Sequence, residues 1–231
     1  MKVLELNDIS FSYKETLVLS DFSYTFKKGK IYAVVGHNGA GKTTLLWLCL
    51  KLLKPKQGTV AFAENTTVSF MPDRGGVFNH LTVEQNIRVS MAVYHINKDS
   101  IEKNVVSALK KWRLEAKRKS LATNLSLGEK QRLSFILAEI NNADIMFLDE
   151  PTSNIDIVSQ ELLNSRLIEL KELGKTVIVS SHDIKLIESV GDEIIIIDDT
   201  RIVYSGEMKD VSNLATLYRK HTEVGHDNEN N

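Results

Sequence analysis

The sequence predicts an α/β fold whose centre is a buried, mostly parallel β-sheet. Strongly apolar runs of strand length occur at residues 31–35, 145–148 and 176–180. The segments that follow these runs space their apolar residues at helical intervals. Strands that are apolar on both sides and alternate with helices are typical of sheets that helices cover on both faces. A chain of 231 residues is long enough for one such domain with an inserted subdomain.

The composition excludes several classes of protein. Hydrophobic residues make up 42% of the chain and charged residues 26%, which is ordinary for a globular protein. A net charge of -1 gives no electrostatic reason to expect nucleic acid as a partner. The single cysteine, Cys49, excludes an internal disulfide and a Cys-rich zinc site, and its apolar surroundings indicate a packing role. Because charge interrupts the first residues and no run approaches 18 apolar residues, we expect no signal peptide, no membrane span and a cytoplasmic location.

The first 30 residues alternate apolar and polar side chains, with a break near Lys14 and Glu15. This period-two pattern predicts antiparallel strands ahead of the first parallel strand. Turn residues at 27–30 lead into the strand at 31–35. After the helix that follows, the sequence predicts a turn at 54–58 and strands at 59–63 and 67–71.

The middle of the chain changes from a strand pattern to a helical one. Thr82, with Gln85 three residues later, is typical of a helix N-cap with a capping box. A second helix is predicted after Asp99 or Ser100, with one apolar face made by Ile101, Val105, Leu109 and Trp112. The basic run at 110–119 contains one aromatic residue, and we interpret it as a solvated helix face, with nucleic-acid contact as the alternative.

Strands and helices alternate again after residue 143. A helix is predicted after the strand at 145–148, and Gly174 ends it. The strand at 176–180 is followed by a helix at 184–190, and residues 193–204 indicate a final hairpin. The polar residues 222–231 are expected to form a disordered tail.

The turn after the strand at 31–35 matches G-x-x-x-x-G-K-[ST], the phosphate-binding P-loop. Its glycines let the backbone turn tightly and direct N–H groups toward an anion, and the next helix adds the positive end of its dipole. Lys42 can reach the β- and γ-phosphates, and the Thr43 hydroxyl can hold Mg²⁺. We therefore predict a nucleoside triphosphate site made by Gly36, His37, Asn38, Gly39, Ala40, Gly41, Lys42, Thr43 and Thr44.

Two adjacent carboxylates end the apolar strand at 145–148. Asp149 is predicted to hold the metal ion of a bound Mg-nucleotide. Glu150 points to another side of the strand end, where it can accept a proton from, or orient, the water that attacks the γ-phosphate. Pro151 prevents the strand from continuing. The alternative is that the two acids only mark the end of a strand, and the P-loop favours the functional interpretation.

Over essentially its whole length the chain resembles the ATP-binding subunit of an ABC transporter. The family's motifs recur in the family's order: Walker A at 36–44, a signature resembling LSGGQ at 125–132, Walker B at 145–150 and a D-loop segment at 151–156. His182 occupies the position of the switch histidine, and Tyr13 that of an aromatic residue that stacks on adenine. An ordered set of motifs is far more specific than Walker A alone.

The resemblance implies a role for each of these residues. ATP and Mg²⁺ are the expected cofactors, with the metal near Thr43, Asp149 and Asp73. Glu150 and His182 are the expected catalytic residues. The signature and D-loop residues are expected to close on ATP that is bound to a second copy or a homologous subunit, in a head-to-tail dimer; these residues are Ser126, Gly128, Glu129 and Asp156.

Part of the signature can also be interpreted without a ligand. Ser126 with Glu129 spells a capping box, which alone would explain both residues as the start of a helix, and the two interpretations are compatible.

Two departures from the family pattern matter more. Leu127 replaces a common glycine, and Asp73 replaces a glutamine that normally meets the metal or its water. As an alternative, Asp73 only starts the turn at 73–76.

These observations predict a P-loop NTPase (RecA-like) fold in a single domain at 1–221. Its core would comprise 1–75 and 141–221, with an antiparallel β subdomain and an inserted helical subdomain at about 76–140. We expect an ATPase that powers a membrane transporter, of the bacterial exporter kind. It would dock on separate permease subunits near residues 73–86, on the cytoplasmic side of the membrane.

Two other functions remain open from the sequence. A soluble ABC-type ATPase acting on ribosomes or DNA usually carries two cassettes, coiled coils or zinc insertions. This chain has one Walker A, no sustained heptads and one cysteine, so no nucleic-acid partner is expected. A weakly hydrolysing nucleotide-binding regulator is the other alternative, because Asp73 and Leu127 depart from the family pattern.

Overall fold

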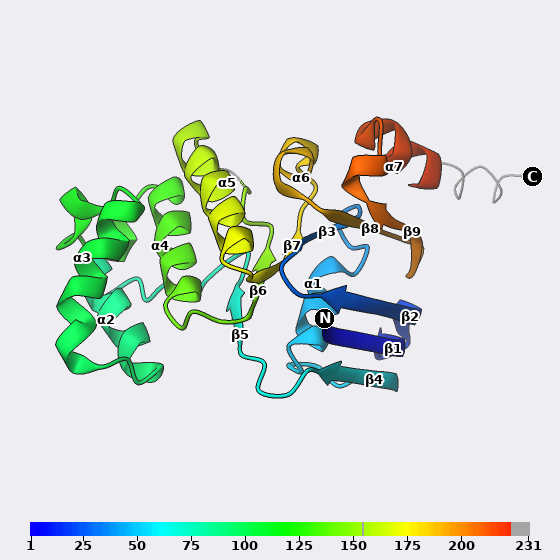
Figure 1. Cartoon of the computed structure of the whole chain (residues 1–231), viewed down its shortest axis with the longest axis horizontal. Coiled ribbons are helices and arrows are strands. Elements are labelled where there is room, and N and C mark those ends of the chain that lie inside the picture. The colour runs from blue at the N-terminus through cyan, green and yellow to red at the C-terminus, as the bar shows by residue number, and fades with distance from the viewer. Residues whose placement is uncertain (154, 223–231) are drawn as a thin grey trace, which may run out of the picture.

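The computed structural model describes residues 1–153 and 155–222, which form two β-sheets layered with helices (Figure 1). The larger sheet has six strands in the order β5-β6-β7-β3-β8-β9, and the smaller has three in the order β2-β1-β4. In that order, the larger sheet consists of β5 (Val68–Met71), β6 (Ile145–Asp149), β7 (Thr176–Ser180), β3 (Ile31–Val35), β8 (Glu193–Asp198) and β9 (Arg201–Glu207). The smaller sheet consists of β2 (Thr16–Lys27), β1 (Lys2–Tyr13) and β4 (Gln57–Phe62).

The larger sheet is mostly parallel, as the sequence predicts. Each neighbouring pair from β5 to β8 is parallel, whereas β9 is antiparallel to β8 and forms the expected hairpin with it. The carboxyl ends of parallel strands meet at one edge of a sheet, where ligands of such folds bind. The segments that follow β3, β6 and β7 therefore lie side by side. The register pairs Asp149 at the end of β6 with Ser180 at the end of β7.

Helices cover both faces of the larger sheet (Figure 1). One face carries α5 (Ile157–Glu172), α6 (Ile184–Val190) and α7 (Leu214–Thr222). The other face carries α1 (Lys42–Cys49) and, beyond it, the smaller sheet. Strand β3 serves both layers, since Ile31 packs with the α5–α7 side and Tyr32 with the α1 side. All five residues of β3 are buried, which explains its continuous apolar sequence.

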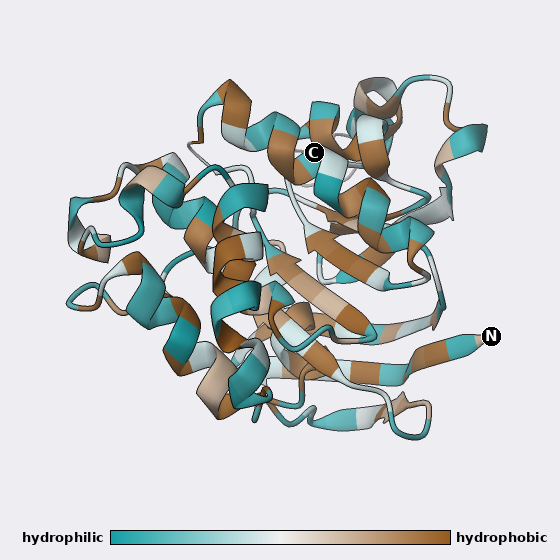
Figure 2. Cartoon of the chain, turned by 60° about the vertical axis from the view of Figure 1, so that its left-hand side comes forward, coloured by the Kyte–Doolittle hydropathy of each residue, from teal (hydrophilic) through white to brown (hydrophobic). Residues whose placement is uncertain are grey.

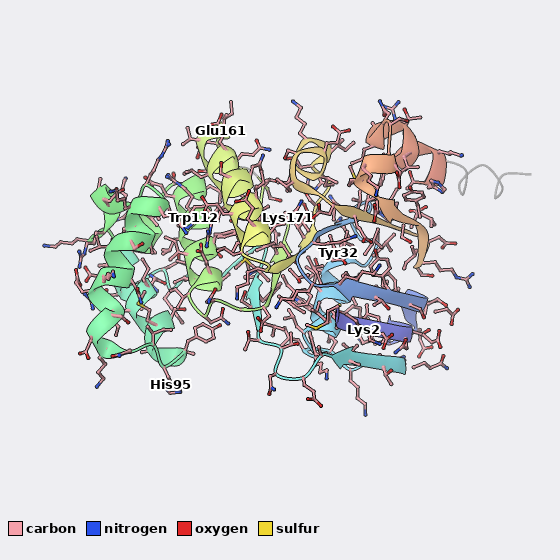
Figure 3. The ribbon with its side chains drawn as sticks, viewed as in Figure 1. Lys2, Tyr32, His95, Trp112, Glu161 and Lys171 are labelled. Atoms are coloured by element: carbon pink, nitrogen blue, oxygen red, sulfur yellow. The ribbon has the colours of Figure 1, made fainter. Side chains whose placement is uncertain are left out.

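Apolar segments gather on the strands and on the inward sides of the helices (Figure 2). Tyr32 lies inside the β-rich part of the molecule, where its hydroxyl accepts a hydrogen bond from the backbone N–H of Lys27 at 2.6 Å (Figure 3). Its ring meets the edge of Phe26, with the ring centroids 4.9 Å apart. Trp112 lies in the helical part of the molecule and packs against Phe135, with the ring centroids 4.6 Å apart. Each side chain buried in this way contributes about 1.5–3 kcal/mol.

Three α-helices occupy the chain between β5 and β6, namely α2 (Val83–Val93), α3 (Ile101–Lys111) and α4 (Leu127–Glu139). The predicted capping box is confirmed, because Thr82 Oγ accepts from Gln85 N at 3.1 Å and Gln85 Oε1 accepts from Thr82 N at 2.8 Å. Ser100 is the N-cap of α3, although its side chain makes no capping bond. The expected apolar face is confirmed, because Val105, Leu109 and Trp112 are buried and Ile101 packs partly buried against the same core.

The structure corrects the sequence-based expectation at two places. Strand β4 begins at Gln57, inside the stretch predicted as a turn. Thr222, which we placed in a disordered tail, ends helix α7, a helix that the sequence did not predict. The rest of that predicted tail, 223–231, lies outside the described residues. Within 1–153 and 155–222, none of the helices has both the length and the apolar character that crossing a bilayer requires.

Candidate functional site

The P-loop connects β3 to α1 at the carboxyl edge of the larger sheet. Gly41 is the N-cap of α1, with φ 98°, and no side chain caps the helix. Its first N–H groups are therefore available to an anion, together with the positive end of the helix dipole. A Cβ on Gly36 would lie 2.7 Å from the carbonyl oxygen of Ile197, so this position also requires glycine. The local backbone thus has the features of a phosphate site.

Lys42 is buried and directed back along the loop. Its ammonium donates to the carbonyl oxygens of Gly36 at 2.8 Å and His37 at 3.2 Å. It also lies 3.3 Å from Glu150 Oε1. A buried ammonium held by carbonyl oxygens is a cation available to a phosphate at the mouth of the loop.

The Thr43 hydroxyl meets the carboxylate of Asp149. Thr43 Oγ1 lies 2.9 Å and 3.1 Å from the two carboxylate oxygens. Burial raises the pKa of Asp149 above its ordinary value, while hydrogen bonds from Ser180 and Thr43 oppose this rise. The negative charges of Glu150 and Asp73 raise it further. Hydroxyl and carboxylate oxygens are the ligands that Mg²⁺ prefers, so the pair fits this metal.

Glu150 joins the strand end to the segment after β7. Its Oε2 is 2.8 Å from Nδ1 of His182, and the backbone N–H of His182 points at the same oxygen at 3.4 Å. The backbone of Glu150 is left-handed, with φ 47°. Together these contacts place an acid, paired with an imidazole, next to Lys42. The pair can hold a water molecule and receive its proton.

The other P-loop residues differ in burial. Ala40 and Thr44 are buried, whereas His37, Asn38 and Gly39 are exposed. The ring of His37 places Nε2 3.4 Å from Asp198 Oδ1.

Tyr13 lies at the tip of the β1–β2 hairpin. It is 43% exposed, and its ring meets Phe11 edge-on at 4.9 Å. Val18 of the same hairpin approaches the P-loop, since a Cβ on Gly41 would lie 3.1 Å from Val18 Cγ1. The hairpin is therefore a neighbour of the loop. An exposed tyrosine ring near its tip is available for stacking.

The signature residues form a second group at the start of α4. Ser126 is the N-cap, with Oγ accepting from Glu129 N at 3.2 Å, and Glu129 Oε2 accepts from Ser126 N at 2.9 Å. Gly128 is buried against the start of α5, since its Cβ would lie 2.2 Å from Asp156 Oδ2. Asp156 caps α5 by accepting from Ser159 N at 2.9 Å, and hydrogen bonds from Ser159 lower its pKa.

The two groups are separate within the described residues. Ser126 and Glu129 bond to each other at the start of α4, Asp156 bonds to Ser159 at the start of α5, and Glu129 pairs with Lys117; among the described residues none of these contacts reaches the P-loop. Asp73 lies in the loop after β5 and is partly exposed. Its Oδ2 is 3.6 Å from Nε of the neighbouring Arg74. Asn154 of the D-loop segment lies outside the described residues.

Sequence reasoning missed Ser180. It is buried at the end of β7, and its hydroxyl donates to Asp149 Oδ1 at 2.5 Å. One signal for it existed, since a polar side chain follows three apolar residues at the end of the strand, two residues before His182. The pairing of β6 with β7, which makes the contact, could not be derived from that signal.

A family model described as ABC transporter matches residues 19–153, more than half of the chain. The chain belongs to the ABC transporter family. It is an ATP-binding subunit and an ATPase of that family, with ATP as its nucleotide. The alternative of a soluble ABC-type ATPase acting elsewhere is accordingly not favoured, since the curated relatives are transporter subunits.

Individual relatives of the ABC transporter family cover nearly the whole chain. The SkfA peptide export ATP-binding protein SkfE of Bacillus subtilis is 29% identical over 211 residues, covering 88% of each chain. The bacitracin transport ATP-binding protein BcrA of Enterococcus faecalis is 31% identical over an alignment of 233 positions, which covers 96% of this chain and 73% of BcrA. A solved ATP-binding subunit of an ABC transporter has a TM-score of 0.83 at 24% identity, covering 96% of this chain and 97% of that one. This likeness confirms the predicted fold class.

Proposed function

We propose that this ABC transporter subunit binds Mg²⁺ with ATP at the P-loop and hydrolyses ATP to power export across a membrane. The observation that carries the proposal is the linked group Thr43, Asp149, Glu150 and His182 beside Lys42. Each member has the chemistry that phosphoryl transfer to water needs. The alternative, a regulator that binds ATP without hydrolysing it, would not need an acid paired with an imidazole.

The P-loop residues 36–44 would hold the phosphates. Backbone N–H groups at the start of α1 and the ammonium of Lys42 would bind the β- and γ-phosphate oxygens, with Tyr13 stacked against the adenine. Thr43 and Asp149 would hold Mg²⁺, and Asp73 would contribute through a water molecule. The metal, when bound, would neutralise negative charge on the phosphate oxygens.

Glu150 and His182 would act on the attacking water. Glu150 is held from both sides, by Lys42 at Oε1 and by His182 at Oε2. A carboxylate fixed in this way can orient a water molecule and accept its proton, with His182 donating to the carboxylate and lying next to the γ-phosphate. The reaction would cleave the bond between the γ-phosphorus and the bridging oxygen, and Lys42 would stabilise the charge that develops.

Ser126, Gly128, Glu129 and Asp156 would complete the site of a second subunit. Because their contacts do not include the P-loop of their own chain, we assign them to ATP bound by another copy or a homologous subunit. The start of α4 supplies backbone N–H groups for its γ-phosphate. ATP would hold this head-to-tail dimer together, and hydrolysis would release it.

A groove beside the P-loop core is the proposed docking site for the permease. It has a volume of about 210 Å³ and lies between the end of β5 and helices α2 and α4. Its most exposed apolar side chains are Phe78 (58%) and Val93 (66%), and it overlaps the region 73–86 expected from the sequence. An apolar groove of this kind suits a short helix of a partner protein.

The export direction and the location are supported more indirectly. SkfE is named for peptide export and BcrA for bacitracin transport, and both align over most of this chain. The subunit would sit on the cytoplasmic side of the membrane through the permease. We also propose the division into a core at 1–75 and 141–221 and a helical subdomain at 76–140, since the chain leaves the larger sheet after β5 and returns to it at β6.

Two measurements test this function. The purified chain should hydrolyse ATP in the presence of Mg²⁺, and it should co-purify with a multispan protein from detergent-solubilised membranes. Isolation with ribosomes or DNA and no membrane partner would contradict the transporter role. Tight ATP binding without turnover would instead support the regulator.

A further inference from the structure

Ser180 lies at the centre of the candidate site but belongs to none of its motifs. It is fully buried at the end of β7, where the three residues before it are apolar. The parallel register places it beside Asp149, the last residue of β6. A polar side chain at such a position needs a hydrogen-bonding partner, because burying an unpaired hydroxyl is unfavourable.

The hydroxyl of Ser180 makes two hydrogen bonds. It donates to Asp149 Oδ1 at 2.5 Å, and its oxygen accepts from the backbone N–H of Glu150 at 3.1 Å. One hydroxyl therefore connects the carboxylate that we assign to the metal with the residue that we assign to the attacking water. The contacts continue on both sides, to Thr43 through Asp149 and to His182 through Glu150.

Glu150 depends on this connection because of its backbone. Its φ of 47° is in the left-handed region, which is unfavourable for a residue that has a Cβ. Such a conformation persists only where the surroundings hold it. Ser180 supplies two acceptors to the same N–H, its hydroxyl and its carbonyl oxygen, the latter at 3.0 Å.

We infer that Ser180 is a positioning residue, which fixes the Asp149 carboxylate and the Glu150 backbone in one arrangement for hydrolysis. The inference rests on the proposed function. Ser180 would act through these two residues and not through a contact of its own with the phosphates. Without the hydroxyl, Thr43 is the one side-chain donor left to Asp149 Oδ1 among the described residues, and the Glu150 N–H keeps the Ser180 carbonyl oxygen as its acceptor. The link between the two residues is lost, so each is held less firmly.

The test compares Ser180→Ala with Ser180→Thr and with a matched control, Ser69→Ala. Ser69 is a buried serine on β5 of the same sheet, and its hydroxyl has no hydrogen-bond partner in the part of the chain that the structure describes. Each protein is assayed for kcat and for KM of ATP. The affinity of its ATP complex for Mn²⁺ is measured by the electron paramagnetic resonance signal of free Mn²⁺, and thermal unfolding checks the fold.

The hydroxyl role predicts a specific pattern. Ser180→Ala should lower kcat about ten- to thirty-fold and weaken Mn²⁺ binding about five-fold, as expected for one lost hydrogen bond to a charged group. KM for ATP should change by less than about two-fold, since the P-loop contacts remain. Ser180→Thr keeps the hydroxyl, so its kcat and its Mn²⁺ affinity should stay within about three-fold of those of the unmodified protein. Ser69→Ala should match the unmodified protein in kcat and in Mn²⁺ affinity.

Several outcomes would overturn the inference. These are normal kcat and Mn²⁺ affinity in Ser180→Ala, an equal loss in Ser69→Ala, or equal losses in folded Ser180→Thr and Ser180→Ala. If Ser180→Thr does not fold, the comparison of Ser180→Ala with Ser69→Ala decides. If the unmodified protein itself neither hydrolyses ATP nor binds Mn²⁺ with ATP, the proposed function fails. If the unmodified protein does both and only the expected effect of Ser180→Ala is missing, the inference about Ser180 fails and the proposed function stands.

Discussion

Gly128 shows how a single residue sets the distance between two helices. A Cβ at this position would lie 2.2 Å from Asp156 Oδ2 and 2.9 Å from Ser159 Oγ. Asp156 has little freedom to move away, because Ser159 binds one of its oxygens through the backbone N–H and the other through the hydroxyl, at 2.9 Å and 2.8 Å. The glycine therefore lets the start of α4 contact the start of α5.

Gly128→Ala should destabilise the protein. Overpacking of this kind costs about 1–3 kcal/mol, and we expect a lower midpoint of thermal unfolding. Leu127→Ala is the matched control, since Leu127 is the preceding residue, is 53% exposed and should change the free energy of unfolding by less than about 0.5 kcal/mol. Equal stabilities of the two variants would show that α4 and α5 adjust freely.

Glu150→Gln should separate ATP binding from hydrolysis. The amide keeps the shape of the side chain but cannot accept a proton, so kcat should fall by about 10²–10⁴-fold. ATP affinity should persist, and the ATP-bound dimer should last longer in size-exclusion chromatography. Glu161→Gln, at an exposed position on α5 (Figure 3), should leave kcat unchanged. Near-normal turnover in Glu150→Gln would remove Glu150 from the role of the base.

At the scale of elements, the start of α2 is hydrogen-bonded to residues 118–120, in the segment that leads to the signature at 125–132. Backbone N–H groups of Val83 and Glu84 donate to the carbonyl oxygens of Ser120 and Arg118 at 3.0 Å and 3.1 Å. The guanidinium of Arg118 also binds both carboxylate oxygens of Glu84, at 2.6 Å and 2.8 Å. This contact holds the segment that ends at Ser126 in a defined place beside α2.

The Glu84 contact should make stability depend on pH. Arg118, and then Arg88, lower the pKa of Glu84 from 4.5 to about 2. A carboxyl whose pKa is lowered by folding stabilises the protein fully above its unfolded pKa, and this stabilisation is lost as the pH falls toward the folded value. Glu84→Gln should therefore lower the free energy of unfolding at pH 7 by on the order of 1 kcal/mol.

The difference between Glu84→Gln and the unmodified protein should shrink as the pH falls from 4.5 toward 2, as measured by denaturant unfolding at a series of pH values. Glu115→Gln is a suitable control, because Glu115 is exposed and has no ion pair among the described residues. A difference that stays constant over this range would mean that the charge of Glu84 is not what stabilises the contact.

At the scale of the whole molecule, the end of β5 and helices α2 and α4 form a groove between them. Phe70 and Pro72 line it from the core side, and Val89, Val93 and Tyr94 line it from α2 and the residue after it. A partner in this groove would touch both parts at once. Movement of the helices relative to the larger sheet would then be transmitted to the permease.

Val93→Asp should weaken association with the permease without impairing ATP binding. A charge in an apolar docking groove is unfavourable unless it is paired, so co-purification with the membrane partner should drop several-fold. Val106→Asp is the matched control, because Val106 is an exposed valine on α3 that does not line the groove. Equal co-purification of both variants would place the docking surface elsewhere.

The sequence by itself determined the features that depend on local chemistry. The parallel strands follow from continuous apolar runs, and the capping boxes at Thr82 and Ser126 follow from side chains that bond to backbone three residues away. The P-loop is equally local, because its glycines and Lys42 act within nine consecutive residues. The roles of Tyr13, Asp73 and the other site residues stay predictions.

Only the tertiary structure decided which distant residues meet. The pairing of β6 with β7 brings Ser180 to Asp149, and the packing of α4 on α5 brings Gly128 to Asp156. Strand order and helix packing arise from contacts between segments far apart in the chain, which local periodicity does not encode. Helix α7 was missed for a related reason, since of its residues only Leu214 is buried, and the contact with β8 and β9 holds it in place.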